Sequence, residues 1–183
     1  KYLDGSTAPE VKFKMNYPAI LSFGAGYSND MIDIAADYRF VNYEKTIGFS
    51  AKGWSATGSV NGFGWQNMSV ISAGFQYKGI KKMPLRVGYT YSSCPIKSEL
   101  AFFSTPATAV IKNAFQLGFG YEASKHVTLN AVYHHGASGD GISGPMLNPM
   151  MVSGSNPYGA VPSSSVSYKM TTDLIMFGIN YTF

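Results

Sequence analysis

The sequence predicts an all-β fold, a transmembrane antiparallel β-barrel with about seven strands in this chain. Apolar and polar residues alternate with a period of two in seven separate segments, the pattern of strands with two different faces. Short and long connectors alternate between these segments. Only 13% of the 183 residues are charged and 15% are aromatic, which excludes disorder. No apolar run approaches the roughly 20 residues of a spanning helix.

Each predicted strand carries apolar or aromatic residues on one face and small or polar residues on the other. In chain order the strands cover 21–27, 32–40, 71–77, 85–91, 115–121, 127–134 and 175–183. A three-residue turn at 28–30 joins the first two. We expect the first strand to reach back to Val11 with an interruption at Pro18. We expect the last to begin near Ser164 and to rise above the membrane, because about 9–11 tilted residues suffice to cross it.

The composition of the two faces indicates which of them meets lipid. The apolar face of most segments ends in Tyr or Phe, as in the aromatic girdles of outer-membrane barrels, and the opposite face is rich in Gly and small polar residues. The connectors at 28–30, 78–84 and 122–125 are short, and those at roughly 45–65, 92–112 and 137–163 are long. Short periplasmic turns and long outer loops are typical of such barrels. A soluble β-sandwich that serves as a binding module also alternates and stays an alternative.

The strand number raises a question of closure. Bacterial single-chain barrels have an even number of strands, and an open edge in lipid costs several kcal/mol for each unpaired backbone group. One interpretation is a small barrel of eight strands with a structural or adhesive role and no transport. The other is that residues 1–183 form a single β-barrel region of a larger barrel, whose remaining strands lie elsewhere in sequence.

Several charged and polar residues fall on the face that we expect to line the lumen. The candidates for ligand binding there are Arg39, Arg86, Gln116, Asn130 and His134. Buried charges are usually paired, so ion pairing within the wall is one interpretation of these residues. The other is that Arg39 or Arg86 receives an anionic head group such as a carboxylate, which suits the arginine fork.

Apolar side chains also cluster in the long connectors, where exposed patches usually mark a contact surface. The candidates for capturing a hydrophobic compound outside the membrane are Trp54, Phe63, Trp65, Phe102, Phe103, Met146, Met150 and Met151. Flexible methionines suit varied apolar ligands. Packing of one loop against another explains the same residues equally well.

Other kinds of site find little support. His134 and His135 lie near Asp140, but a metal site needs three convergent ligands and His126 is at the opposite end of that strand. The single Cys94 permits no internal disulfide. No nucleophile with a base stands out, so we predict no enzyme, no metal and no cofactor. The basic residues are scattered and include only two arginines, which argues against nucleic acid as a partner.

Short motifs in the chain resemble a known family. The alternation of Phe177, Ile179, Tyr181 and Phe183 resembles the C-terminal signal by which the outer-membrane assembly machinery recognises barrels. The stretches YPAILSFGAGY at 17–27, IAADYR at 34–39, LRVGYTY at 85–91, LGFGY at 117–121 and LNAVYH at 129–134 resemble the C-terminal half of the FadL family, outer-membrane transporters of long-chain fatty acids and hydrocarbons.

That resemblance implies a 14-stranded barrel, of which seven strands are half, in the outer membrane of a Gram-negative bacterium. It implies passive uptake of fatty acids or other hydrophobic compounds, with membrane lipid and a hydrophobic small molecule as partners. An N-terminal hatch that plugs the lumen and the first strands of the wall are expected in residues that this sequence does not contain.

Overall fold

The computed structural model describes residues 13–183, which form strands and three short 3-10 helices. The strands are β1 (Ala19–Ser28), β2 (Ile32–Asn42), β3 (Met68–Tyr77), β4 (Leu85–Ser92), β5 (Asn113–Glu122), β6 (Val127–Ala137), β7 (Ile142–Gly144), β8 (Val166–Tyr168) and β9 (Thr171–Tyr181). The 3-10 helices are η1 (Tyr43–Lys45), η2 (Ser98–Ser104) and η3 (Pro149–Met151). No helix in the described part of the chain has the length and hydrophobicity needed to span a membrane.

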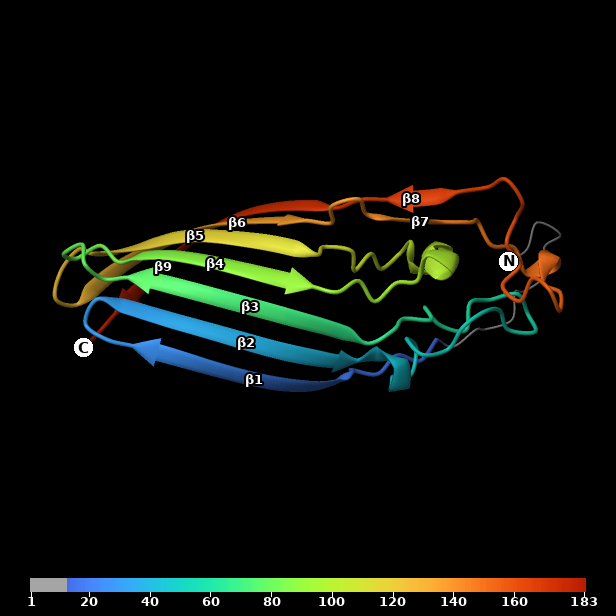
Figure 1. Cartoon of the computed structure of the whole chain (residues 1–183), viewed down its shortest axis with the longest axis horizontal. Coiled ribbons are helices and arrows are strands. Elements are labelled where there is room, and N and C mark those ends of the chain that lie inside the picture. The colour runs from blue at the N-terminus through green and yellow to red at the C-terminus, as the bar shows by residue number, and fades with distance from the viewer. Residues whose placement is uncertain (1–12) are drawn as a thin grey trace.

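Seven of these strands form one antiparallel sheet in the order β1-β2-β3-β4-β5-β6-β9, which we call the strand wall. All seven predicted strands are therefore confirmed. Short turns join the strands at one end of the wall, and long connections leave the other end (Figure 1). Strands β7 and β8 pair separately beyond that second end. Within residues 13–183, β1 and β9 each have a neighbour on one side only.

Two predicted strand limits are wrong. The last strand is not continuous from Ser164, because β8 ends at Tyr168 and pairs with β7, whereas β9 begins at Thr171 and pairs with β6. The chain changes partners at Met170, whose N–H donates to the hydroxyl of Ser138.

The first strand begins at Ala19 and not earlier. Residues 13–17 are irregular, and Pro18 stands just before the strand, where its missing N–H removes no bond from the ladder. The expected beginning at Val11 lies outside the described residues.

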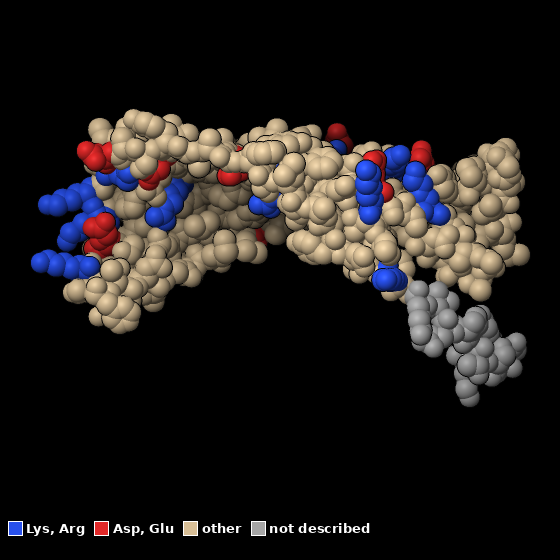
Figure 2. All heavy atoms as spheres, turned by 90° about the horizontal axis from the view of Figure 1, so that it is seen from below, with Lys and Arg blue, Asp and Glu red and all other residues tan. Residues whose placement is uncertain are grey.

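The register of the wall separates its two faces. Phe23, Phe75, Phe119 and Phe177 lie on one face and are all exposed, so they form no dry internal cluster. The other face carries the charged and small residues. Figure 2 shows the molecule hollowed at its turn end, with charged side chains in the hollow and at the tips of the turns. The apolar face is therefore the outer, lipid-facing surface, as the alternation predicts.

The dry interior lies in the three long connections, residues 43–67, 93–112 and 138–170, which we call the loop module. One buried cluster contains Trp65, Ile96, Ala101, Val110 and Ile142. A second contains Leu100, Phe103 and Leu147. The three connections supply residues to these clusters jointly, so the module packs as one unit.

Candidate functional site

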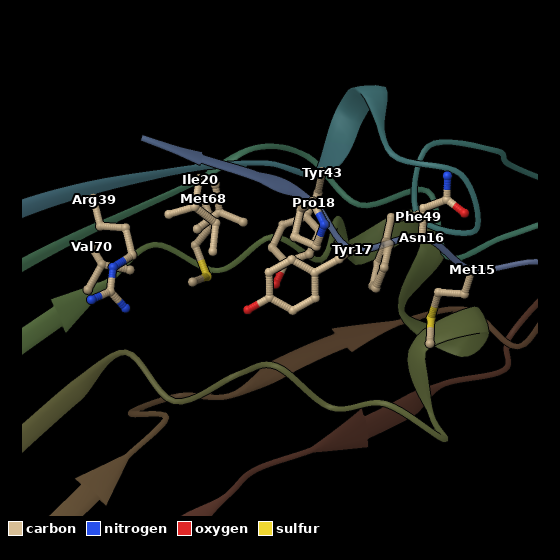
Figure 3. A pocket seen from close by; sticks show the side chains of 11 residues that line it. Met15, Asn16, Tyr17, Pro18, Ile20, Arg39, Tyr43, Phe49, Met68 and Val70 are labelled. Carbon is tan, nitrogen blue, oxygen red and sulfur yellow. The ribbon is translucent and has the colours of Figure 1, made fainter. Parts of the chain in front are cut away.

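A pocket of about 560 Å³ opens on the inner face of the wall where β1, β2 and β3 meet the loop module. Its lining is mostly apolar: Met15, Asn16, Tyr17, Pro18, Ile20, Arg39, Val41, Tyr43, Phe49, Met68 and Val70. Figure 3 shows Arg39 at one end beside Val70 and Met15 at the other, with aromatic rings between them. We call this the inner-wall pocket. An elongated apolar molecule with one anionic end matches this distribution of groups.

Arg39 is the cation of the inner-wall pocket. It lies on β2 opposite Ser22 of β1 and Val70 of β3, neither of which carries a charge. Among residues 13–183, the guanidinium of Arg39 takes part in no salt bridge. Burial raises the pKa of Tyr43, which shares the pocket, and this is the effect of a weakly polar surrounding. Arg39 itself is exposed on the isolated chain, and its planar guanidinium fork suits the two oxygens of a carboxylate.

Arg86, in contrast, is held by the wall itself. Its Nε donates to Gln76 Oε1 at 2.5 Å, and its Nη1 donates to Asn130 Oδ1 at 2.9 Å. Gln76 in turn donates to Asp33, whose carboxylate also pairs with Lys78 at 2.7 Å. This polar ladder joins β2, β3, β4 and β6 near the turn end. Two of the predicted site residues, Arg86 and Asn130, are thus brought together.

Glycines on β5 let the Arg86 side chain reach β6. Gly118 lies directly opposite Arg86, and Gly120 lies directly opposite Asn130. A Cβ at Gly118 would lie 3.0 Å from a methyl of Val132, and one at Gly120 would lie 3.3 Å from Asn130 Oδ1. Both are tighter than ordinary contacts, so a side chain on β5 would crowd the path that the guanidinium follows. The glycine-rich inner face therefore has a structural reason.

Gln116 and His134 form a second polar pair on the inner face. Gln116 Nε2 lies 3.0 Å from His134 Nδ1 across β5 and β6. Gly88 leaves space for this amide, since a Cβ there would lie 2.8 Å from Gln116 Oε1. This pair is separate from the Arg86 ladder, so the five predicted lumen residues divide into two bonded pairs and Arg39.

The two arginines lie at different depths of the wall. Arg86 lies opposite Gln76, which lies opposite Asp33 of β2, so these three residues share one level of the wall. Arg39 is six positions further along β2 than Asp33. Six residues of strand span about 20 Å. Between these levels the inner face of β1 and β3 bears only Gly24, Gly26, Ser72 and Gly74. On β2 the same stretch carries Ala35 and Asp37, and the Asp37 carboxylate occupies the space above Gly24.

The predicted capture residues of the loop module occupy different environments. Trp65 was expected at the surface but is buried, with 6% of its side chain exposed, so the structure corrects this expectation. Its indole N–H donates to the Ser104 hydroxyl at 2.8 Å, because a large ring with one polar atom packs best where that atom has a partner. Trp54 is half-buried and donates to the carbonyl of Tyr158. Phe63, Phe102 and the mostly buried Phe103 line a second apolar pocket of about 540 Å³, the loop pocket.

The methionines of the loop module lie on its surface. Met146 and Met151 are exposed, and Met150 is almost fully so, at 92%. The remaining lining of the loop pocket comes from Phe13, Val60, Thr105 and Pro106. Sequence reasoning did not single out Phe13 or Val60, since neither lies in a conspicuous apolar run.

The histidines bond to other groups and do not converge. His126 Nδ1 lies 2.9 Å from the carbonyl oxygen of Thr182, His134 pairs with Gln116, and His135 Nδ1 lies 2.8 Å from Asp173 Oδ1. Over residues 13–183, no three His, Cys, Asp or Glu side chains are grouped as a metal site requires. Cys94 is partly buried as a free thiol at the edge of the larger buried cluster of the loop module.

A hollow antiparallel sheet with an apolar outer face, and with its small and charged residues on the inner face, is the wall of an outer-membrane β-barrel. The family model described as outer membrane protein transport protein (OMPP1/FadL/TodX) matches residues 3–182. The chain therefore belongs to this family of transport proteins, which are not enzymes, in the Gram-negative outer membrane.

Solved structures with the same fold include two toluene transporters and a FadL homologue. TodX of Pseudomonas putida is 16% identical with a TM-score of 0.58, and TbuX of Ralstonia pickettii is 16% identical with a TM-score of 0.51. A FadL homologue of Pseudomonas aeruginosa is 15% identical with a TM-score of 0.59. The match covers 90–91% of this chain but only 34–35% of those chains. No curated protein matches the sequence.

Proposed function

We propose that this chain forms part of the wall of an outer-membrane channel that admits hydrophobic compounds, and that long-chain fatty acids are among them. The observation that carries the proposal is the inner-wall pocket, in which Arg39 stands at one end of a mostly apolar lining. An apolar tail gains about 25 cal/mol for each Å² that it buries there. The carboxylate gains a charge-assisted, bidentate hydrogen bond from Arg39.

Transfer through this channel involves binding without chemistry. A hydrophobic compound first lodges in the loop pocket against Phe63 and Phe102, and then passes to the inner-wall pocket. Phe49 and Phe63 stand with their ring centroids 5.7 Å apart, and Phe49 lines the inner-wall pocket. One aromatic pair thus stands between the two pockets, which makes them neighbours on the proposed route of the ligand.

The test of the head-group role is Arg39→Gln in the full-length protein. Binding of a long-chain fatty acid is expected to fall by roughly 10- to 100-fold, since hydrogen bonds to charged groups contribute about 1.5–3 kcal/mol. Binding of the alcohol of equal chain length should stay within roughly twofold, because it carries no charge. Arg86→Gln is the matched control, since Arg86 is already bonded to Gln76 and Asn130.

Equal loss of acid and alcohol binding in Arg39→Gln would mean that Arg39 only shapes the pocket and does not bind the carboxylate. Unchanged acid binding would remove the fatty-acid proposal, while leaving uncharged hydrocarbons as the substrate class. Loss of acid binding in Arg86→Gln alone would move the head-group site to the turn end of the wall.

The capture role of the loop pocket has its own test. Phe102→Ala should slow uptake at low ligand concentration and leave the maximal rate unchanged, because it weakens the first encounter only. Val152→Ala is the control, because Val152 is an exposed apolar residue of the same module that lies outside the loop pocket and outside the predicted capture set. Equal uptake by both variants at every concentration would limit Phe102 to loop packing.

We also propose that Phe177, Ile179, Tyr181 and Phe183 form the assembly signal. Their side chains are all exposed, three of them on the outer face of β9, so a partner protein can reach them before the barrel closes. Phe183→Ala should lower the amount of assembled protein in the outer membrane without changing its transport per molecule. Normal assembly of this variant would remove Phe183 from the signal.

A further inference from the structure

The lipid-facing side of the wall carries a groove of about 580 Å³ that the transport path does not use. Its outward side chains are Leu85, Leu117, Phe119, Ala131, Tyr133, Ile175 and Phe177. Ala131 lies on β6 directly between Phe119 of β5 and Phe177 of β9. A methyl group between two rings leaves a trough along β6, with the rings as its two sides.

A polar cluster stands at the loop end of this groove. Tyr133 lines the groove, and its hydroxyl donates to Asp173 Oδ1 at 2.6 Å. His135 Nδ1 lies 2.8 Å from the same oxygen. Both bonds use Oδ1 of a side chain that is 55% exposed, so the carboxylate keeps capacity to accept further bonds. A carboxylate is costly in hydrocarbon, which places Asp173 at the level of the head groups.

We propose that this groove binds the acyl chain of a glycolipid of the outer leaflet, whose sugar hydroxyl or amide groups donate to Asp173. The apolar trough and the acceptor at its outer end are arranged along one strand, as the tail and head of an amphiphile require. Continuous pairing of β5, β6 and β9 separates the groove from the inner face. The occupant therefore comes from the membrane and not from the channel.

The test is lipid retention by the full-length protein, purified in mild detergent, supplied with lipid A or with phosphatidylcholine, whose head group has no hydrogen-bond donor, and observed by native mass spectrometry. Ala131→Trp fills the trough. Ala73→Trp is the matched control, since Ala73 also points outward but lies on β3, outside the groove. Retention of lipid A is expected to be at least roughly tenfold lower in Ala131→Trp than in the wild type or Ala73→Trp.

Asp173→Asn tests the head-group contact. It should reduce retention of lipid A and leave retention of phosphatidylcholine unchanged. Ala131→Leu, which fills the trough with less bulk, serves if Ala131→Trp fails to fold into a heat-modifiable barrel. Fatty acid transport by all folded variants should equal that of the wild type, which separates this proposal from the channel function.

Three results would overturn the proposal. Equal retention of lipid A by the wild type and Ala131→Trp would mean that the groove holds only ordinary annular lipid and no specific glycolipid. The same loss in Ala73→Trp as in Ala131→Trp would show that any added ring has this effect. Equal retention of both lipids by the wild type and Asp173→Asn would remove the glycolipid as occupant.

Discussion

The strand wall and the loop module are stabilised in different ways. Among the described residues, the only buried hydrophobic side chains of the wall are Val41 and Ala114, both near its loop end. Every residue of β1 is exposed on the isolated chain. The loop module, by comparison, contains two dry clusters around Leu100 and Trp65. The wall therefore depends on ladder hydrogen bonds and surrounding lipid, whereas the loop module depends on side-chain packing, as a soluble domain does.

The largest effect should come from a cavity in the loop module. Leu100→Ala empties a fully buried site and is expected to cost about 2–5 kcal/mol of local stability. Hydrogen exchange should then become faster across 93–112 and remain slow in the strands. Leu117→Ala, on the lipid face, is the control and should leave both regions unchanged. Faster exchange throughout the wall in Leu100→Ala would show that the two regions are not independent.

A charge on the lipid face tests the wall in turn. Leu117 lies near the middle of β5 and points outward, whereas Gln116 is its inward neighbour. Leu117→Arg is expected to cost about 2–4 kcal/mol, the usual cost of arginine at the bilayer midplane. Gln116→Arg should cost much less. Reversible unfolding in lipid vesicles gives both values, and similar costs would mean that the faces are assigned the wrong way round.

A smaller effect is expected from the Arg86 ladder. Arg86→Gln breaks the bonds to Gln76 and Asn130 on a partly exposed surface, and about 1 kcal/mol of wall stability should be lost. Arg39→Gln should change stability by less, because Arg39 has no salt bridge within the described residues. Unfolding of the two variants in parallel measures the contrast. Equal losses would contradict the distinction between a structural and a ligand-binding arginine.

The smallest effect concerns pH and is confined to the loop module. Burial, and then the nearby Cys94, raises the pKa of Tyr168 to about 12. In the folded module the phenol of Tyr168 stays protonated up to about pH 12, whereas in the unfolded chain it ionises near pH 10. Stability is therefore full below pH 10 and falls as the pH rises from 10 to 12. The ring is half-buried, so solvent screening limits the loss to about 1 kcal/mol or less.

Tyr168→Phe should flatten this dependence, although it also removes the hydroxyl bond to the carbonyl of Ala101. Hydrogen exchange of the loop module at pH 9 and at pH 11 is the measurement. A wild-type module that is equally stable at both values would show that the phenol ionises freely in the folded state.

The sequence predicts the wall well because alternation is local. The pattern around Phe119 and Gly118 reveals both the strand and its two faces without any knowledge of the partner strands. The loop module has no such period, so the pairing of β7 with β8 and the burial of Leu100 depend on contacts between distant segments. The change of partner near Met170 is invisible for the same reason.

The candidate site was predicted only in part. The alternation of side chains along the strands predicts that Arg39, Arg86 and Asn130 lie on the inner face. Which of them bond to one another depends on register, and on Gly118 leaving a path across β5. The inner-wall pocket also needs Phe49 and Met15 from irregular segments. Only the folded chain therefore distinguishes an arginine that binds the wall from one that faces a pocket.

The shared clusters of the loop module also have an evolutionary consequence. Trp65, Ile96 and Ile142 come from three different connections, yet they pack in one buried cluster. A relative cannot exchange one of these connections for a longer or differently shaped one without leaving voids beside the other two. Changes in these connections should therefore be coordinated across all three segments.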